Sequence, residues 1–133
     1  MRGNVRVLVP GRARGPALVL GEPISFWGGI DPRTGRVIDR RHPQAGEVIA
    51  GTILVMPSGR GSSTSSTVLA ECIRAGTAPA AIVLHEGDPI LVVGAVVAGE
   101  LYGRSIPVVV AAPGLIPDGA TVEIEEERVR ILG

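Results

Sequence analysis

A run of glycine, arginine and serine residues, PSGRGSSTSS at 57–66, separates an apolar segment from a segment with helical spacing. Glycines at positions 59 and 61 permit a positive φ and a close approach of the backbone to a ligand. The hydroxyl residues behind them fall at the expected start of a helix, where free N–H groups and the helix dipole favour negative charge. Arg60 adds a cation that can hold a carboxylate or a phosphate through two hydrogen bonds. The stretch therefore indicates an anion-holding loop, and a plain capped loop is the structural alternative.

Other common catalytic groups are scarce in this chain. All 13 basic residues are arginines, which excludes lysine Schiff-base chemistry and a phosphate-binding lysine of the Walker type. A serine hydrolase is disfavoured because no G-x-S-x-G motif occurs and only His42 and His85 could act as bases. His42 lies in a long polar segment and is the better functional candidate of the two. The lone Cys72 excludes an internal disulfide or a multi-cysteine metal site in this chain alone, and its apolar surroundings predict a buried thiol.

The overall composition is that of a globular protein. The 133 residues predict one domain, 1–133, with 45% hydrophobic residues and a formal net charge of zero. A balanced charge gives no support to a nucleic-acid partner. The longest apolar run is about half of the roughly 20 residues that a membrane helix needs, so we expect no membrane partner and a cytoplasmic location.

Hydrophobic patterns predict a compact α/β domain with a mixed sheet rather than a doubly wound one. A helix is expected over 63–76, with serine and threonine as N-caps and Gly76 at its end. Residues 90–101 are ambiguous, and we favour a short strand end followed by a small helix. The pattern over 121–132 fits two strands or one bent strand, with the acidic EIEEER on a solvated face. The remaining expectations are strands at 5–10, 17–20, 52–56, 80–84 and 106–111, a turn at 11–16, and a functional or partner-binding loop at 28–51.

Residues 28–66, together with AGTAPAAIVL at 75–84 and GAVVAGELYGRSIPVV at 94–109, resemble the small subunit of the aconitase X family. The chain more closely resembles the archaeal branch of that family, which acts on phosphomevalonate. The resemblance covers nearly the whole chain, and PSGRGSS is a specific part of it. The resemblance implies the swivelling β/β/α domain of the aconitases as a separate polypeptide. That polypeptide would close over a large subunit that binds an iron–sulfur cluster of the 4Fe–4S type.

Site residues can be carried over from the family's motif. In related dehydratases the first serine of a G-S-S turn abstracts the proton, and Ser62 matches that serine. The family pattern places an arginine two residues later, where this chain has Thr64, so Arg60 is the candidate replacement for the carboxylate clamp. Asp31 is alternatively a turn residue before Pro32. No metal ligand is expected on this chain, and the substrate-binding candidates are Arg60, Gly61, Ser63, Gly29, Asp31 and His42.

The resemblance implies a hydro-lyase subunit that is active only as a heterodimer with the large subunit. The expected reaction is dehydration of (R)-5-phosphomevalonate to trans-anhydromevalonate 5-phosphate in the archaeal mevalonate pathway. The alternatives are the small subunit of a cis-3-hydroxyproline-type dehydratase and a non-catalytic anion-binding assembly module. A phosphocarrier domain would need a histidine in the glycine-rich turn, and 57–66 contains none. Four arginines of the long segment suit a substrate-phosphate pocket or the large-subunit interface, with plain solvent exposure as the alternative: Arg33, Arg36, Arg40 and Arg41.

Overall fold

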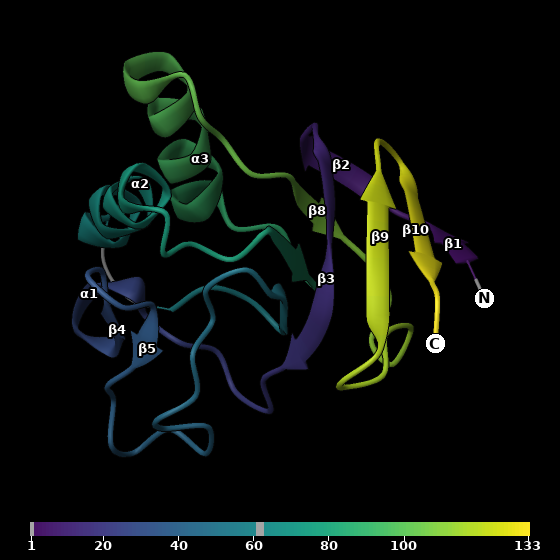
Figure 1. Ribbon diagram of the computed structural model, residues 1–133, viewed down its shortest axis with the longest axis horizontal. Helices are drawn as coiled ribbons and strands as arrows, with labels where there is room; N and C mark the ends of the chain where they lie inside the picture. Colours follow the sequence, from purple (N-terminus) through teal and green to yellow (C-terminus); the bar gives the residue numbers. More distant parts are fainter. Residues whose placement is uncertain (1, 61–62) are drawn as a thin grey trace.

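The chain folds into three layers (Figure 1). Two helices cover one side of the central parallel strands, and a β-hairpin from the end of the chain, which continues the same sheet, covers the other side. The computed structural model describes residues 2–60 and 63–133. Over these residues the main sheet has eight strands in the order β1-β10-β9-β3-β6-β7-β8-β2, and β4 pairs with β5 separately. This mixed α/β architecture confirms the predicted fold class. The elements are β1 (Arg2–Asn4), β2 (Arg6–Val9), β3 (Arg12–Val19), α1 (Phe26–Gly29), β4 (Ile30–Asp31), β5 (Arg36–Val37), β6 (Ile53–Met56), α2 (Thr64–Ala75), β7 (Ala81–Leu84), α3 (Pro89–Tyr102), β8 (Val108–Val110), β9 (Thr121–Glu125) and β10 (Arg128–Ile131).

The parallel strands β6, β7 and β8 form the centre of the sheet and are covered on both faces. In β6, Leu54 and Met56 belong to the core beneath the helices, whereas Ile53 and Val55 belong to the core beneath the hairpin. A strand that is buried on both faces needs apolar residues at every position. The continuous apolar runs at 52–56 and 80–84 therefore predicted these strands correctly.

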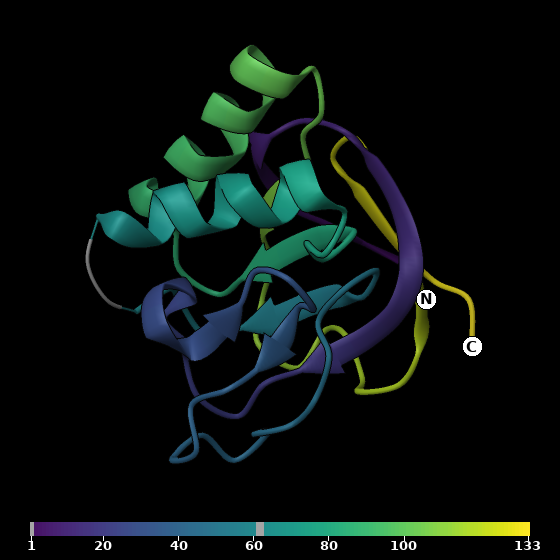
Figure 2. The same cartoon turned by 60° about the vertical axis from the view of Figure 1, so that its left-hand side comes forward.

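The predicted turn over residues 11–16 is wrong, because β3 runs through it and curves around the sheet (Figure 2). The first part of β3 pairs antiparallel with β9, and its last part pairs parallel with β6. A Cβ on Gly15 would lie 2.6 Å from the carbonyl oxygen of Gly51. The glycine therefore marks a close approach between two backbone segments rather than a turn.

Helices α2 and α3 pack against each other over the sheet. Helix α2 ends as predicted, with Gly76 in the left-handed region at φ 79°. The predicted strand end in 90–101 is wrong, because α3 is helical from Pro89 to Tyr102. The side chain of Asp88 caps α3 by accepting a hydrogen bond from the Ile90 N–H at 2.9 Å, and proline occupies the first turn. Among the residues described, no helix has the length and apolar character to cross a membrane.

The long segment 28–51 is anchored to the helix side of the molecule. It includes β4 and β5, and Ile30, Val37 and Ile49 are buried in the core beneath the helices. The Thr77 hydroxyl, just after α2, donates to the carbonyl oxygen of Pro32 at 2.6 Å. The segment is therefore held in a fixed position against the residues that follow α2.

The last two strands, β9 and β10, form an antiparallel hairpin, which is one of the two arrangements that the sequence left open. Val122, Ile124 and Val129 point into the core beneath the hairpin. The acidic residues from Glu125 to Glu127 are exposed, as predicted for a solvated face.

Candidate active site

The glycine, arginine and serine loop leaves β6 at its carboxyl end and leads to α2. The carboxyl ends of parallel strands are where open α/β sheets bind their ligands. The carbonyl oxygen of Pro57 accepts hydrogen bonds from the N–H groups of His85 and Glu86, at 3.1 and 3.0 Å. The loop is thereby attached to the segment that follows β7, which is the neighbouring strand.

Gly59 is required by packing in this loop. Its φ is not positive, so of the two properties that glycine permits, Gly59 uses the close approach of its backbone to neighbouring atoms. A Cβ at this position would overlap Oδ2 of Asp88 and lie 3.2 Å from Cδ1 of Leu91. Asp88 is the residue that caps α3. The backbone of the loop therefore rests directly on the capped start of α3.

We expect the Gly59→Ala variant to lose about 1 kcal/mol of unfolding free energy, because Asp88 must turn away and release its cap. Chemical denaturation of the purified chain measures this change. Gly21→Ala is the matched control, since a Cβ on Gly21 meets no atom within 4 Å. Equal stability of the two variants would contradict the packing role of Gly59.

The start of α2 carries hydroxyl residues, but its N-cap residue, Ser63, makes no side-chain cap within the described part of the chain. Ser63 occupies the N-cap position with helical φ and ψ of −58° and −21°, and its side chain makes no capping hydrogen bond. Its carbonyl oxygen instead accepts from the backbone N–H and the hydroxyl of Ser66, at 3.1 and 2.7 Å. The predicted capping hydrogen bond is therefore not made by the side chain of Ser63. A first turn that Ser63 does not cap leaves backbone donors that suit an anion.

Gly61 and Ser62 lie outside the described residues, so the catalytic and substrate-binding roles expected for them stay predictions. The residues on either side, Arg60 and Ser63, are both exposed.

A buried hydroxyl that the sequence analysis missed attaches α2 to α1. Ser65 is 2% exposed, and its Oγ accepts from the Trp27 N–H at 3.2 Å and lies 3.2 Å from Oγ of Ser25. The Ser25 hydroxyl also lies 2.9 Å from the carbonyl oxygen of Trp27, to which it donates. No sequence signal marks Ser65, because it is one of six consecutive hydroxyl residues at 62–67. Its contacts hold the first turn of α2 in place.

A hollow of about 540 Å³ lies between Arg60 and the turn at residues 38–42. The Arg60 guanidinium lies 4.0 Å from the carboxylate of Glu22, and both side chains are half exposed. Arg40, Arg41 and His42 also line this hollow. The structure therefore brings together two of the predicted site residues, Arg60 and His42, which are 18 positions apart in the sequence.

His42 is 5% exposed, and both of its ring nitrogens face backbone groups. Its Nδ1 accepts from the Gln44 N–H at 3.0 Å, and its Nε2 lies 3.0 Å from the carbonyl oxygen of Glu22. This arrangement is satisfied when Nε2 carries the proton and donates to that carbonyl. The environment of His42 favours a positioning role, in which it holds the 38–42 turn against residue 22, over direct contact with a substrate.

Gly29 and Asp31 do not line the hollow. The Asp31 carboxylate accepts from the backbone N–H of Arg33 at 2.9 Å and from its guanidinium Nε at 3.4 Å. The backbone bond first, and then the guanidinium, hold the pKa of Asp31 below its ordinary value. This geometry is that of a turn residue, the alternative considered from the sequence. Gly29 is buried, and its carbonyl oxygen accepts from the Ile38 N–H at 2.8 Å, which connects it to the edge of the hollow.

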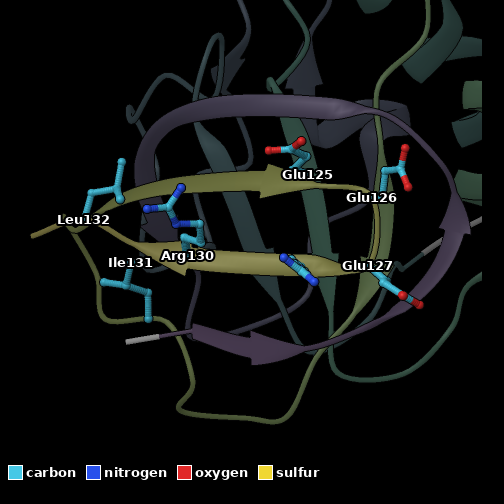
Figure 3. Close-up of a pocket in the computed structure, with 7 residues that line it drawn as sticks. Glu125, Glu126, Glu127, Arg130, Ile131 and Leu132 are labelled. Carbon is cyan, nitrogen blue, oxygen red and sulfur yellow. The ribbon is translucent and has the colours of Figure 1, made fainter.

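A second hollow, of about 600 Å³, lies on the β9–β10 hairpin and has a charged lining (Figure 3). Figure 3 shows Glu125, Glu126 and Glu127 at one end of the hairpin and Arg130 beside β10. Two of these charges are paired, Arg130 with Glu123 at 3.3 Å and Glu125 with Arg12 at 3.2 Å. Its described lining contains no serine, histidine or cysteine, and its three glutamates, Glu125 to Glu127, are exposed.

The described part of the chain offers no cluster of three or more histidine, cysteine or acidic side chains that could hold a metal ion. Cys72 is fully buried in α2, as predicted. Burial raises the pKa of this thiol to about 11, so it is protonated at neutral pH, whereas iron ligands are thiolates. The residues described here therefore do not fit an iron–sulfur cluster.

The fold and the position of the loop define a swivelling domain of the aconitase type. The family described as the aconitase X swivel domain matches residues 2–132, and the chain belongs to that family. The predicted relationship is therefore confirmed. Aconitase X of Thermococcus kodakaraensis, solved in its holo-form, superposes with a TM-score of 0.90 at 34% identity, over 100% of this chain and 99% of the matched chain.

Two kinds of curated relatives resemble this chain over different shares of their lengths. The phosphomevalonate dehydratase small subunit of Methanothermobacter thermautotrophicus is 42% identical over 98% of both chains. The cis-3-hydroxy-L-proline dehydratase of Pseudomonas aeruginosa is 54% identical over 77% of this chain. The chain spans only 18% of the length of that second protein.

Proposed function

We propose that this chain is the small subunit of a hydro-lyase that dehydrates (R)-5-phosphomevalonate to trans-anhydromevalonate 5-phosphate in the archaeal mevalonate pathway. The observation that carries the proposal is the end-to-end match, over 98% of each chain, to a phosphomevalonate dehydratase small subunit. The aconitase X chain that was solved in its holo-form also matches this chain from end to end, and that match supports the same assignment. The expected location is the cytoplasm.

In this proposal Ser62 is the proton acceptor. Oγ of Ser62 enters the step as the alkoxide and takes the proton from the carbon next to the substrate carboxylate. The electron pair of the broken C–H bond forms the new double bond as the hydroxyl on the next carbon departs as hydroxide. The proton held by Ser62 and this hydroxide together make the one molecule of water that is lost. A serine oxygen is a weak base unless donors stabilise its anionic form. The uncapped first turn of α2, which begins at Thr64, is the source of such donors in this proposal.

Arg60 would hold the substrate carboxylate. It lies two positions before Ser62, and its half-exposed guanidinium has only the distant Glu22 carboxylate, at 4.0 Å, as an ion-pair partner among the residues described. A guanidinium can bind a carboxylate through two parallel hydrogen bonds, which sets the orientation of the substrate. Thr64, exposed at the first position of α2, cannot provide that clamp because it carries no charge.

The large subunit would supply the cofactor, which we propose is a 4Fe–4S cluster. The described residues of this chain do not fit a cluster, so its ligands would have to come from the partner. Helix α3, which starts beside the loop, exposes an apolar stripe that suits a subunit contact: Val93, Val96, Val97 and Leu101. A docked partner would cover this stripe and close the loop off from water.

A cis-3-hydroxyproline-type dehydratase is the second candidate, and the 54% identity to the Pseudomonas aeruginosa enzyme favours it. That substrate is an amino acid without a phosphate. The same Ser62 chemistry would serve both reactions, so the loop alone does not distinguish them.

Co-expression of this chain with the large subunit encoded in the same genome tests the proposal. The assembled enzyme is assayed in parallel on (R)-5-phosphomevalonate and on cis-3-hydroxy-L-proline. We expect turnover of the phosphorylated acid only. Turnover of hydroxyproline alone would replace the proposal with the second candidate, and a complex inactive on both substrates would contradict both.

A further inference from the structure

We infer that Arg40 and Arg41 bind a phosphate monoester in the hollow that they line with Arg60. The inference rests on the proposed function and extends it, because it assigns substrate selection to the 38–42 turn of this chain. The structure places the four arginines of the 28–51 segment in different surroundings. Arg33 pairs with Asp31, and Arg36 belongs to β5, whereas Arg40 and Arg41 face the hollow.

The charge of the hollow suits an anion. Its lining holds three arginines and two carboxylates, Glu22 and Asp39, an excess of one positive charge. The Asp39 carboxylate is engaged with the turn itself, because its Oδ1 accepts from the Arg41 N–H at 3.0 Å. Among the ion pairs of the described residues none involves Arg40 or Arg41. Two exposed guanidinium groups are thus available to a ligand.

The turn that carries these arginines is held in position. His42 links it to the carbonyl oxygen of Glu22, and the Gln44 side chain donates to the carbonyl oxygen of Val19 at 3.4 Å. The Ile38 N–H donates to Gly29 at the other end of the turn. A fixed turn lowers the entropy cost of placing two guanidinium groups around one phosphate. Arginine also matches phosphate geometry through paired hydrogen bonds.

This arrangement separates the two candidate substrates. A phosphate monoester carries about −1.5 to −2 charges near neutral pH, in addition to the substrate carboxylate. Arg60 near Ser62 would take the carboxylate, and Arg40 and Arg41 would take the phosphate. Cis-3-hydroxyproline has a carboxylate for Arg60 but no group for Arg40 and Arg41. The hollow therefore favours a phosphorylated hydroxy acid.

Charge-neutral variants of the assembled enzyme test the inference. We expect the double variant Arg40→Gln/Arg41→Gln to raise the KM for 5-phosphomevalonate by about 10- to 100-fold, with a smaller change in kcat, because charged hydrogen bonds to the phosphate are lost. Mevalonate without the phosphate should react equally slowly with the wild type and the variant. Arg128→Gln, which removes an exposed arginine on the hairpin, is the control and should leave the KM unchanged. A wild-type KM in the double variant would overturn the inference.

A second measurement separates failure of the inference from failure of the proposed function. Inorganic phosphate is titrated into the full chain, and the backbone amide signals of residues 38–42 are followed by NMR. We expect shifts at these residues that disappear in the double variant. Such shifts would support the phosphate site even if the assembled enzyme did not dehydrate 5-phosphomevalonate. Shifts absent in the wild type, or unchanged in the double variant, would overturn the inference whatever reaction the enzyme performs.

Discussion

Replacing Ser62 with alanine is expected to lower the rate of dehydration by the assembled enzyme by about 10²- to 10⁴-fold, the usual contribution of a positioned proton acceptor. The hydroxyl is the only group removed, and neither histidine of the chain is free to take over as proton acceptor. His42 is buried with both ring nitrogens facing backbone groups, and His85 is hydrogen-bonded to the carbonyl oxygen of Ala111 at 3.2 Å. The measurement is kcat with saturating substrate, with subunit association checked by gel filtration.

Thr67→Ala is the matched control for this experiment. Thr67 is an exposed hydroxyl residue of α2 that is not a candidate site residue, so its loss should change kcat by only a few-fold, roughly as for an ordinary surface substitution. If Ser62→Ala retained full activity, the proton acceptor would have to lie elsewhere. If Ser62→Ala no longer bound the large subunit, the residue would act in assembly rather than in catalysis.

The substitution Gly94→Val is expected to cost about 1–3 kcal/mol of unfolding free energy, because α3 lies close to α2 at this position. A Cβ on Gly94 would be 2.8 Å from the carbonyl oxygen of Ser66 and 3.1 Å from Cβ of Leu69. Both atoms belong to the first half of α2, and the carbonyl is backbone that cannot rotate away. Relief of the clash would move the start of α2, so activity of the assembled enzyme should fall together with stability.

Gly99→Ala provides the comparison within the same helix. A Cβ on Gly99 would meet only Ser105, at 3.6 Å, which is ordinary contact. Alanine is the better helix former, so this variant should gain up to about 1 kcal/mol. Thermal and chemical unfolding of the two variants measure both effects. A Gly94→Val variant as stable as the wild type would mean that the two helices separate at no cost.

Much of the fold follows from local patterns. The buried strands β6 and β7 were predicted because continuous apolar runs of four or five residues suit strands covered on both faces. The end of α2 was predicted because Gly76 closes a segment with helical spacing. The start of α3 had a local signal too, in Asp88 followed by Pro89, but its nearly continuous apolar composition hid the helical period.

The sequence by itself determined the class of the chain and the stretch to which its chemistry is assigned, since the PSGRGSS loop and its flanking segments identify the aconitase X swivel domain family. Only the tertiary structure decided what surrounds that loop. The course of β3 depends on pairing with β9, more than 100 positions away, which overrides its turn-prone composition. The burial of His42 and Ser65 depends on partners 20 and about 40 positions away in the chain. Local patterns report propensity and burial, whereas contacts between distant segments exist only after the layers have packed.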